Sequence, residues 1–181
     1  CTTGVCISPT TARGRFIAGL DDDDEFMPNR IERLLESYDS AYAFITSYNM
    51  IIKPNGAISY FGKDNTIKFN DMLSMNRVGN QVLVERERLM NVGMYDEDLL
   101  ACQDYDMWLR LIQRYGDAKI IPEYLQVIHE DDNVHRISTK SKNKKKGYWQ
   151  FYKKYKDLID ESDRKYQLYN MFRINEKAMS Q

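Results

Sequence analysis

The stretch RFIAGLDDDDEFMPNRIERLL, residues 15–35, decides the fold that this sequence predicts. Its first part lies in an apolar segment, residues 12–20, with the composition of a short buried strand. Four consecutive aspartates follow, and Pro28 then suits the first turn of a helix with apolar residues at helical spacing. The chain therefore places four carboxylates at the joint between a strand and a helix.

Candidate strands and helices alternate along the rest of the chain. We predict strands at 41–47 and 81–85, a hairpin around Pro54-Asn55-Gly56, and one or two short strands at 118–130, broken at Pro122. We predict helices at 31–38, 86–93 and 103–116, and a short helix with a loop within 67–80. This alternation predicts an α/β domain with a mainly parallel sheet flanked by helices.

The helix at 103–116 has the clearest pattern. Its apolar residues, among them Met107, Trp108 and Leu111, recur at helical spacing and form one face. Asp106 and Arg110 stand four residues apart, which predicts a favourable ion pair on the polar side.

Composition narrows the possible classes of protein. The 181 residues are 43% hydrophobic and carry a formal net charge of −1, which fits a globular domain and predicts no nucleic-acid partner. No apolar run is long enough to span a membrane, and no signal peptide is visible. Three cysteines without a CxxC pair predict a reducing, cytoplasmic compartment.

The composition changes at Lys140. Residues 140–156 hold eight lysines and several aromatic residues but no acid. We therefore expect two regions, an α/β domain at 1–139 and a basic, aromatic helical tail at 140–181. The tail has two interpretations: a solvated lysine-rich helix, or a peripheral contact with anionic lipid at the inner face of the membrane.

The aspartates also have more than one interpretation. Ligands of open α/β sheets bind at the carboxyl ends of the strands, and carboxylates there can hold Mn²⁺ or Mg²⁺, which bridge to substrate phosphates. A solvated acidic turn that favours the next helix N-terminus fits the same residues. An EF-hand loop fits poorly, because Phe26 occupies the position that requires glycine.

Residues 15–35 resemble the DXD region of the family 2 glycosyltransferases, which are metal-dependent, inverting enzymes of the Rossmann-like GT-A fold. In that family an apolar strand runs into an Asp-x-Asp-Asp cluster, and a proline then opens a helix. Residues 85–116, ERERLMNVGMYDEDLLACQDYDMWLRLIQRYG, resemble the second signature of the family, in which a Glu-Asp pair begins a helix. The resemblance covers about residues 12–130.

The resemblance implies roles for individual residues. Asp21, Asp22 and Asp23 bind the nucleotide-sugar, and Asp21 and Asp23 also bind its metal, Mn²⁺ or Mg²⁺. Asp24 supports them. The catalytic base is Asp104, although Gln103 precedes it where the family commonly has glutamate.

Position and resemblance favour different roles for Asp104, and the remaining candidates are weaker. Its place at a helix start alone favours an N-cap.

His129, with His135 as the alternative, lies where similar enzymes often carry histidine or arginine, and one of the two could approach the diphosphate or bind the metal. A surface or core histidine without such a role fits as well. The loop of Asn76, Arg77, Gly79, Asn80 and Gln81 lies where such enzymes line the acceptor side, and an ordinary polar loop fits it as well.

The resemblance therefore implies a hexosyltransferase. We expect transfer of a sugar from a nucleotide donor, with UDP as the expected nucleotide, to a hydroxyl of a cell-surface glycan or lipid-linked acceptor. Because members of the family begin with a nucleotide-binding unit well before the acidic cluster, we expect that unit to be missing and the chain alone to be poorly active. The alternatives are a non-catalytic module that binds divalent cations or a partner, and a nucleotidyltransferase with a similar metal site.

Overall fold

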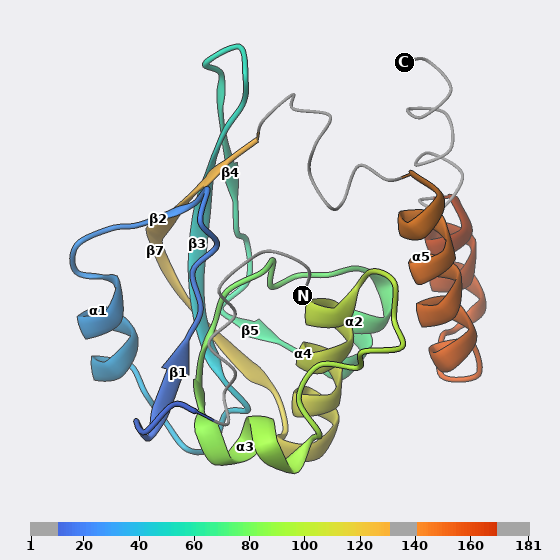
Figure 1. The fold of residues 1–181 in the computed structure, drawn as a ribbon, viewed down its shortest axis with the longest axis horizontal. Coiled ribbons are helices and arrows are strands. Elements are labelled where there is room, and N and C mark those ends of the chain that lie inside the picture. Colours follow the sequence, from blue (N-terminus) through green and yellow to red (C-terminus); the bar gives the residue numbers. More distant parts are fainter. Residues whose placement is uncertain (1–10, 131–140, 170–181) are drawn as a thin grey trace.

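A mixed, strongly curled sheet forms the centre of the protein (Figure 1). The computed structural model describes residues 11–130 and 141–169, with only the main chain for 141–144. The described strands are β1 (Phe16–Ala18), β2 (Glu25–Phe26), β3 (Ile45–Ile52), β4 (Ile58–Phe61), β5 (Thr66–Ile67), β6 (Leu83–Glu85) and β7 (Ala118–His129). Their order is β1-β6-β3-β7-β2, with β4 paired to β3 and β5 to β7.

The α/β class is confirmed, but the sheet is not mainly parallel. Within the described ranges, β3 and β7 form the only parallel pair, and every other pairing is antiparallel. The reason lies in the connections. The tight turn at residues 53–57 can join only antiparallel strands, whereas β3 reaches β7 through a long crossover that contains three helices.

The predicted hairpin is confirmed, and the predicted break at Pro122 is wrong. The Lys53 N–H donates to the Ala57 carbonyl at 2.9 Å, and Gly56 has a φ of 78°, as the turn requires. Strand β7 runs through Pro122 as one element, because its pairing with β3 skips residues there: Ser47 pairs with Ile121, and Tyr48 with Tyr124.

Helices cover both faces of the sheet (Figure 1). They are α1 (Arg30–Glu36), α2 (Phe69–Ser74), α3 (Arg86–Asn91), α4 (Gln103–Tyr115) and α5 (Ser141–Tyr155), and residues 161–169 are also helical. The predicted helices up to residue 116 are confirmed, and Gly93 and Gly116 follow α3 and α4 with φ of 82° and 92°. The predicted helical character of residues 170–181 lies outside the described residues.

Adjacent residues of the central strands supply two cores, because side chains alternate across a sheet. Ile45, Leu83 and Ile121 pack with Leu34 of α1 on one face. On the other face, the neighbouring residues Phe44, Val84 and Ile120 pack with α2, α3 and α4. Phe151 and Tyr155 of α5 join this second, larger core. The boundary predicted between 139 and 140 lies within residues 131–140, which the structure does not describe, and stays a prediction.

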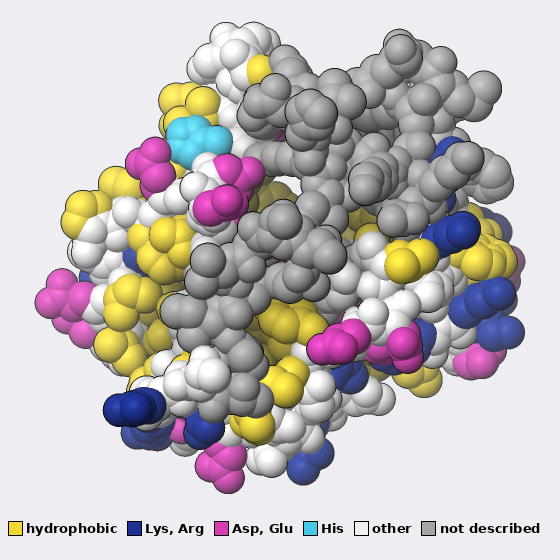
Figure 2. Space-filling view, in the orientation of Figure 1, with side chains coloured by type: hydrophobic (Ala, Val, Ile, Leu, Met, Phe, Trp, Pro, Cys, Tyr) yellow, Lys and Arg dark blue, Asp and Glu magenta, His cyan; other side chains and the backbone are white. Residues whose placement is uncertain are grey.

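Acidic, basic and apolar side chains are interspersed on the face that Figure 2 shows. Among the described helices, none combines the length and the apolarity that a membrane crossing requires.

Candidate active site

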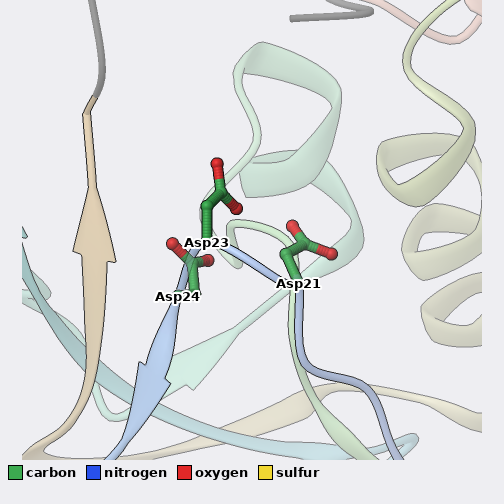
Figure 3. A group of neighbouring side chains, drawn as sticks. All are labelled: Asp21, Asp23 and Asp24. Carbon is green, nitrogen blue, oxygen red and sulfur yellow. The ribbon is translucent and has the colours of Figure 1, made fainter. Parts of the chain in front are cut away.

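The four aspartates form the turn that joins β1 to β2. The Asp24 N–H donates to the Asp21 carbonyl at 3.2 Å and closes the turn, while β2 pairs with β7 beyond it. As a result, Asp21, Asp23 and Asp24 each bring a carboxylate oxygen within 4.8 Å of the others (Figure 3). The exposed Asp22, the fourth aspartate of the turn, is not part of this group.

Asp24 fixes the acidic group to the rest of the sheet through its hydrogen bonds. It is 8% exposed and accepts hydrogen bonds from Asn80 Nδ2 at 3.0 Å, Gln126 Nε2 at 3.4 Å and the His129 main-chain N–H at 3.2 Å. Its partners come from β7 and the loop before β6, so the acidic turn is tied to the middle of the sheet. The family resemblance implied only a supporting role for Asp24, whereas in the structure its carboxylate belongs to the acidic group.

Asn80 and Gln81 hold Asp21. Asn80 Nδ2 lies 2.5 Å from Asp21 Oδ2, and Gln81 Nε2 lies 3.0 Å from Asp21 Oδ1. The loop that the sequence assigned to the acceptor side therefore contacts the acidic turn through these two residues. Asn76 instead folds the loop on itself, accepting from the Val78 and Gly79 N–H groups.

Gln81 is fixed by several elements at once. Its carbonyl accepts from Thr46 Oγ1 at 2.9 Å and from the buried Arg30 at 3.4 Å. Gly19 makes room for its side chain, because a Cβ there would lie 2.4 Å from Gln81 Oε1. Gly19, two residues before the acidic turn, therefore allows the Gln81 side chain to lie close to the main chain.

The acidic group has the chemistry of a divalent-metal site. Partial burial raises the pKa of Asp21, and the charges of Asp24, Asp23 and Asp22 raise it further, while the Asn80 hydrogen bond lowers it. A cation would relieve this repulsion, and an all-oxygen donor set suits a hard ion such as Mg²⁺ or Mn²⁺.

Asp104 lies in the first turn of α4 and is not its N-cap. The N-cap is Cys102, which has a left-handed φ of 66°, so the N-cap interpretation of Asp104 is wrong. Burial raises the pKa of Asp104 to about 6, the charge of Asp21 contributes to this rise, and a hydrogen bond from Tyr95 opposes it. Asp104 and the acidic turn are therefore close enough to interact electrostatically.

Tyr95 is a site residue that the sequence analysis missed. It follows Gly93 and Met94, both with positive φ, in the turn after α3. Its hydroxyl donates to Asp104, and partial burial, followed by the charges of Asp104 and Asp21, raises the pKa of Tyr95. Tyr95 lies within the second signature, but its spacing alone gives no sign of this contact.

His129 lies at the edge of the acidic turn. Its Nε2 is 3.0 Å from Glu25 Oε1, and its main-chain N–H contacts Asp24. Among the described residues it is not part of the acidic group, so its role as a metal ligand stays a prediction. His135 lies outside the described residues.

Comparison with known proteins agrees with this geometry. Residues 10–95, which include the acidic turn, Asn80, Gln81 and Tyr95, match the family model described as glycosyl transferase family 2. These residues carry a glycosyl transferase family 2 domain. Asp104 lies beyond the segment that matches the family 2 model.

Related proteins extend the likeness to more of the chain. The chain is 31% identical over 176 residues to the putative colanic acid biosynthesis glycosyl transferase WcaA of Escherichia coli (strain K12), covering 93% of this chain and 62% of the relative. It is 28% identical over 135 residues to the uncharacterized glycosyltransferase MJ1057 of Methanocaldococcus jannaschii, covering 70% of this chain and 47% of the relative. It is 26% identical over 122 residues to the putative teichuronic acid biosynthesis glycosyltransferase TuaG of Bacillus subtilis (strain 168), covering 62% of this chain and 47% of the relative.

The chain spans between about half and three fifths of the length of these relatives. The expectation that a nucleotide-binding unit is missing gains no support from the matches. The family 2 domain at residues 10–95 holds the whole acidic group, so the binding of a cation can be tested on this chain directly.

Proposed function

We propose that the protein is an inverting, metal-dependent hexosyltransferase that uses a nucleotide-sugar, with UDP as the expected nucleotide. The observation that carries this proposal is the convergence of Asp21, Asp23 and Asp24, with Asp104 close enough for the Asp21 charge to raise its pKa. The acceptor is a hydroxyl of a cell-surface glycan or a lipid-linked sugar. The names of two relatives, which refer to colanic acid and teichuronic acid biosynthesis, support this choice.

The acidic group would hold the donor through its diphosphate. Asp21 and Asp23 would bind Mn²⁺ or Mg²⁺ with Asp24 beside them, and Asn80 and Gln81 would keep the carboxylate of Asp21 in place. When bound, the cation would offset the negative charge that the diphosphate gains as it leaves. His129 is a further candidate ligand, with its Nε2 next to Glu25 in this structure.

Asp104 would act as the general base. Its carboxylate would take the proton of the acceptor hydroxyl while that oxygen forms a bond to the anomeric carbon. The bond from the anomeric carbon to the diphosphate would break on the opposite side, and the diphosphate would leave with the electron pair. A single displacement of this kind inverts the anomeric centre. The hydrogen bond from Tyr95 would hold Asp104 in its ionised form.

The first test concerns the metal site and does not depend on the base. Calorimetric titration of Mn²⁺ with and without UDP is expected to show tighter Mn²⁺ binding in the presence of UDP. Asp23→Ala should abolish this coupling, whereas Glu32→Ala removes the same charge from an exposed position on α1, outside the group, and should largely retain it. A simple cation-binding module would bind the metal equally well with or without UDP, which would remove the transferase proposal.

The base is tested by Asp104→Asn in the same assays and in sugar transfer by the full-length protein. Transfer is expected to fall by about 10²–10⁴-fold, the usual contribution of a general base, while Mn²⁺ and UDP binding persist. The variant should fold well, because burial disfavours the charge that it removes. Turnover at the wild-type rate would contradict the role of Asp104, and lost Mn²⁺ binding would assign it to the metal site.

A further inference from the structure

Helix α5 has two chemically different faces. Gly147, Phe151 and Tyr155 point inward, and Phe151 is fully buried and stacked on Tyr105 with ring centroids 4.2 Å apart. The residues of the opposite face recur every three or four positions, as expected for one side of a helix. They are Lys145, Lys146, Trp149, Tyr152 and Lys153, joined by Lys156 directly after the end of the helix, and we call them the basic face.

The basic face combines an exposed tryptophan, a half-buried tyrosine that also packs against the core, and lysines. Trp149 is 46% exposed and stacks on Tyr152 with ring centroids 5.5 Å apart, and Lys153 Nζ lies 5.5 Å from the Trp149 centroid. The helix contains no acidic residue, whereas solvated helices usually mix both signs of charge. Tryptophan and tyrosine favour the headgroup level of a membrane, and lysines there meet lipid phosphates.

Among the described residues, the acids near α5 are engaged elsewhere or follow the helix in the chain. Lys154 points inward to Asp96 at 2.8 Å and Asp106 at 2.7 Å and is not part of the basic face. Asp157, Asp160 and Glu161 follow α5 in the chain, and Asp160 accepts the N–H of Asp163 at 2.8 Å in the next turn. Since the whole chain has a net charge of −1, any attraction of α5 to an anionic surface is local.

The inner side of α5 lies along the loop that leads to Asp104. Gln150 accepts the Leu100 N–H at 3.1 Å and donates to the Asp98 carbonyl at 2.9 Å. Gly147 is so close to the loop that a Cβ there would lie 2.2 Å from the Ala101 nitrogen. In Figure 1, α5 stands at the edge of the molecule, on the side away from α1.

We propose that the basic face docks on an anionic phospholipid surface, with α5 lying in the plane of the headgroups. Trp149 inserts between headgroups while Tyr152 supports its ring from the protein side, and the lysines contact the phosphates. The inward contacts of Phe151 and Tyr155 keep the rest of the protein above the surface. This inference goes beyond the proposed function, and its test needs neither donor nor acceptor.

The experiment is co-sedimentation of the purified chain with vesicles. Binding is expected to mixed phosphatidylcholine–phosphatidylglycerol vesicles and not to phosphatidylcholine alone, and it should weaken as added salt screens the charges. Trp149 emission should shift to the blue on binding, and Trp149→Phe should remove the shift because Trp108 is only 4% exposed.

Two triple variants with the same change in net charge test whether the vesicles bind to the basic face. Lys146→Glu with Lys153→Glu and Lys156→Glu should weaken binding by about a hundredfold or more, since each lysine near such a surface strengthens binding about fivefold. The control changes three exposed lysines elsewhere, Lys53, Lys63 and Lys68, to glutamate and should bind almost normally.

Four results would overturn the proposal. Three of them are no binding to the mixed vesicles, equal binding to both kinds of vesicle, and equal losses in the two triple variants. Wild-type binding that does not respond to salt would also overturn it, and this measurement depends on no variant.

Discussion

Asp104 and Asp106 lie two residues apart on α4 and have different surroundings. Asp104 is half-buried beside the acidic turn, whereas Asp106 is fully buried. Asp106 accepts from Arg110 Nε at 2.8 Å, Tyr155 Oη at 2.7 Å and Lys154 Nζ at 2.7 Å. The predicted pair of Asp106 and Arg110 does form, but within the protein, because α5 covers this side of α4. A buried carboxylate with three donors holds two helices together.

The protonation of Asp104 gives a prediction at the scale of one residue. Its pKa in the folded protein, about 6, lies above its ordinary value of 3.8, and a base works only when it is ionised. We therefore expect kcat/KM of the full-length enzyme to rise with pH through about 6, or somewhat lower where a bound cation offsets the charge of Asp21. The pH–rate profile measures this limb.

The pH–rate profile of Tyr95→Phe tests whether Tyr95 acts on Asp104. The Tyr95 hydrogen bond lowers the pKa of Asp104, so its removal should move the acidic limb to higher pH. Tyr60→Phe, at a position that is 62% exposed on β4, is the matched control and should leave the profile unchanged. A limb that stays in place in Tyr95→Phe would show that Tyr95 does not act on the base.

At the scale of elements, the sequence predicted helices and strands with long regular patterns better than it predicted very short strands and contacts between distant residues. The helix at 103–116 and the hairpin were predicted because each carries a period or a turn signal over many residues. Strands β2 and β5 were missed because two residues each carry no period, and Pro122 concealed that β7 continues through a bulge. The acidic turn was predicted from its composition. Asn80, Gln81 and Tyr95 were not assigned as its partners because their contacts depend on how distant segments pack.

Gly147 offers a test of how α5 sits against its loop. Gly→Ala in an exposed helix normally stabilises a protein by about 0.5–1 kcal/mol. Here the new Cβ would lie 2.2 Å from the Ala101 nitrogen and 2.6 Å from its Cβ, so Gly147→Ala should instead destabilise by about 1–3 kcal/mol. Urea unfolding measures the sign, and Lys146→Ala on the outer face should change little. A stabilised Gly147→Ala variant would mean that α5 is not held against this loop.

For the whole molecule, the question is whether the tail folds with the α/β domain. Phe151, Tyr155 and Ile159 belong to the same core as α4, and Tyr155 completes the partners of the buried Asp106. A tail that shares a core in this way should unfold together with the sheet in one cooperative step. The boundary predicted at 139 and 140 from composition would then mark a change of surface chemistry and not a separate folding unit.

Two aromatic residues of α5 decide between these possibilities. Phe151→Ala removes a fully buried ring and should lower the free energy of unfolding of the whole chain by about 3–5 kcal/mol. Trp149→Ala removes a larger ring that is 46% exposed and should cost within about 0.5 kcal/mol. Both are measured by urea unfolding, with Phe151→Ala made in a Trp149→Phe background so that Trp108 alone reports fluorescence from the core, and with far-ultraviolet circular dichroism for the helices. Coincident transitions that shift together in Phe151→Ala would mean one unit, because Trp108 reports from α4 and the lost ring from α5. An early loss of helix signal, with the Trp108 transition unchanged, would mean that the tail folds separately.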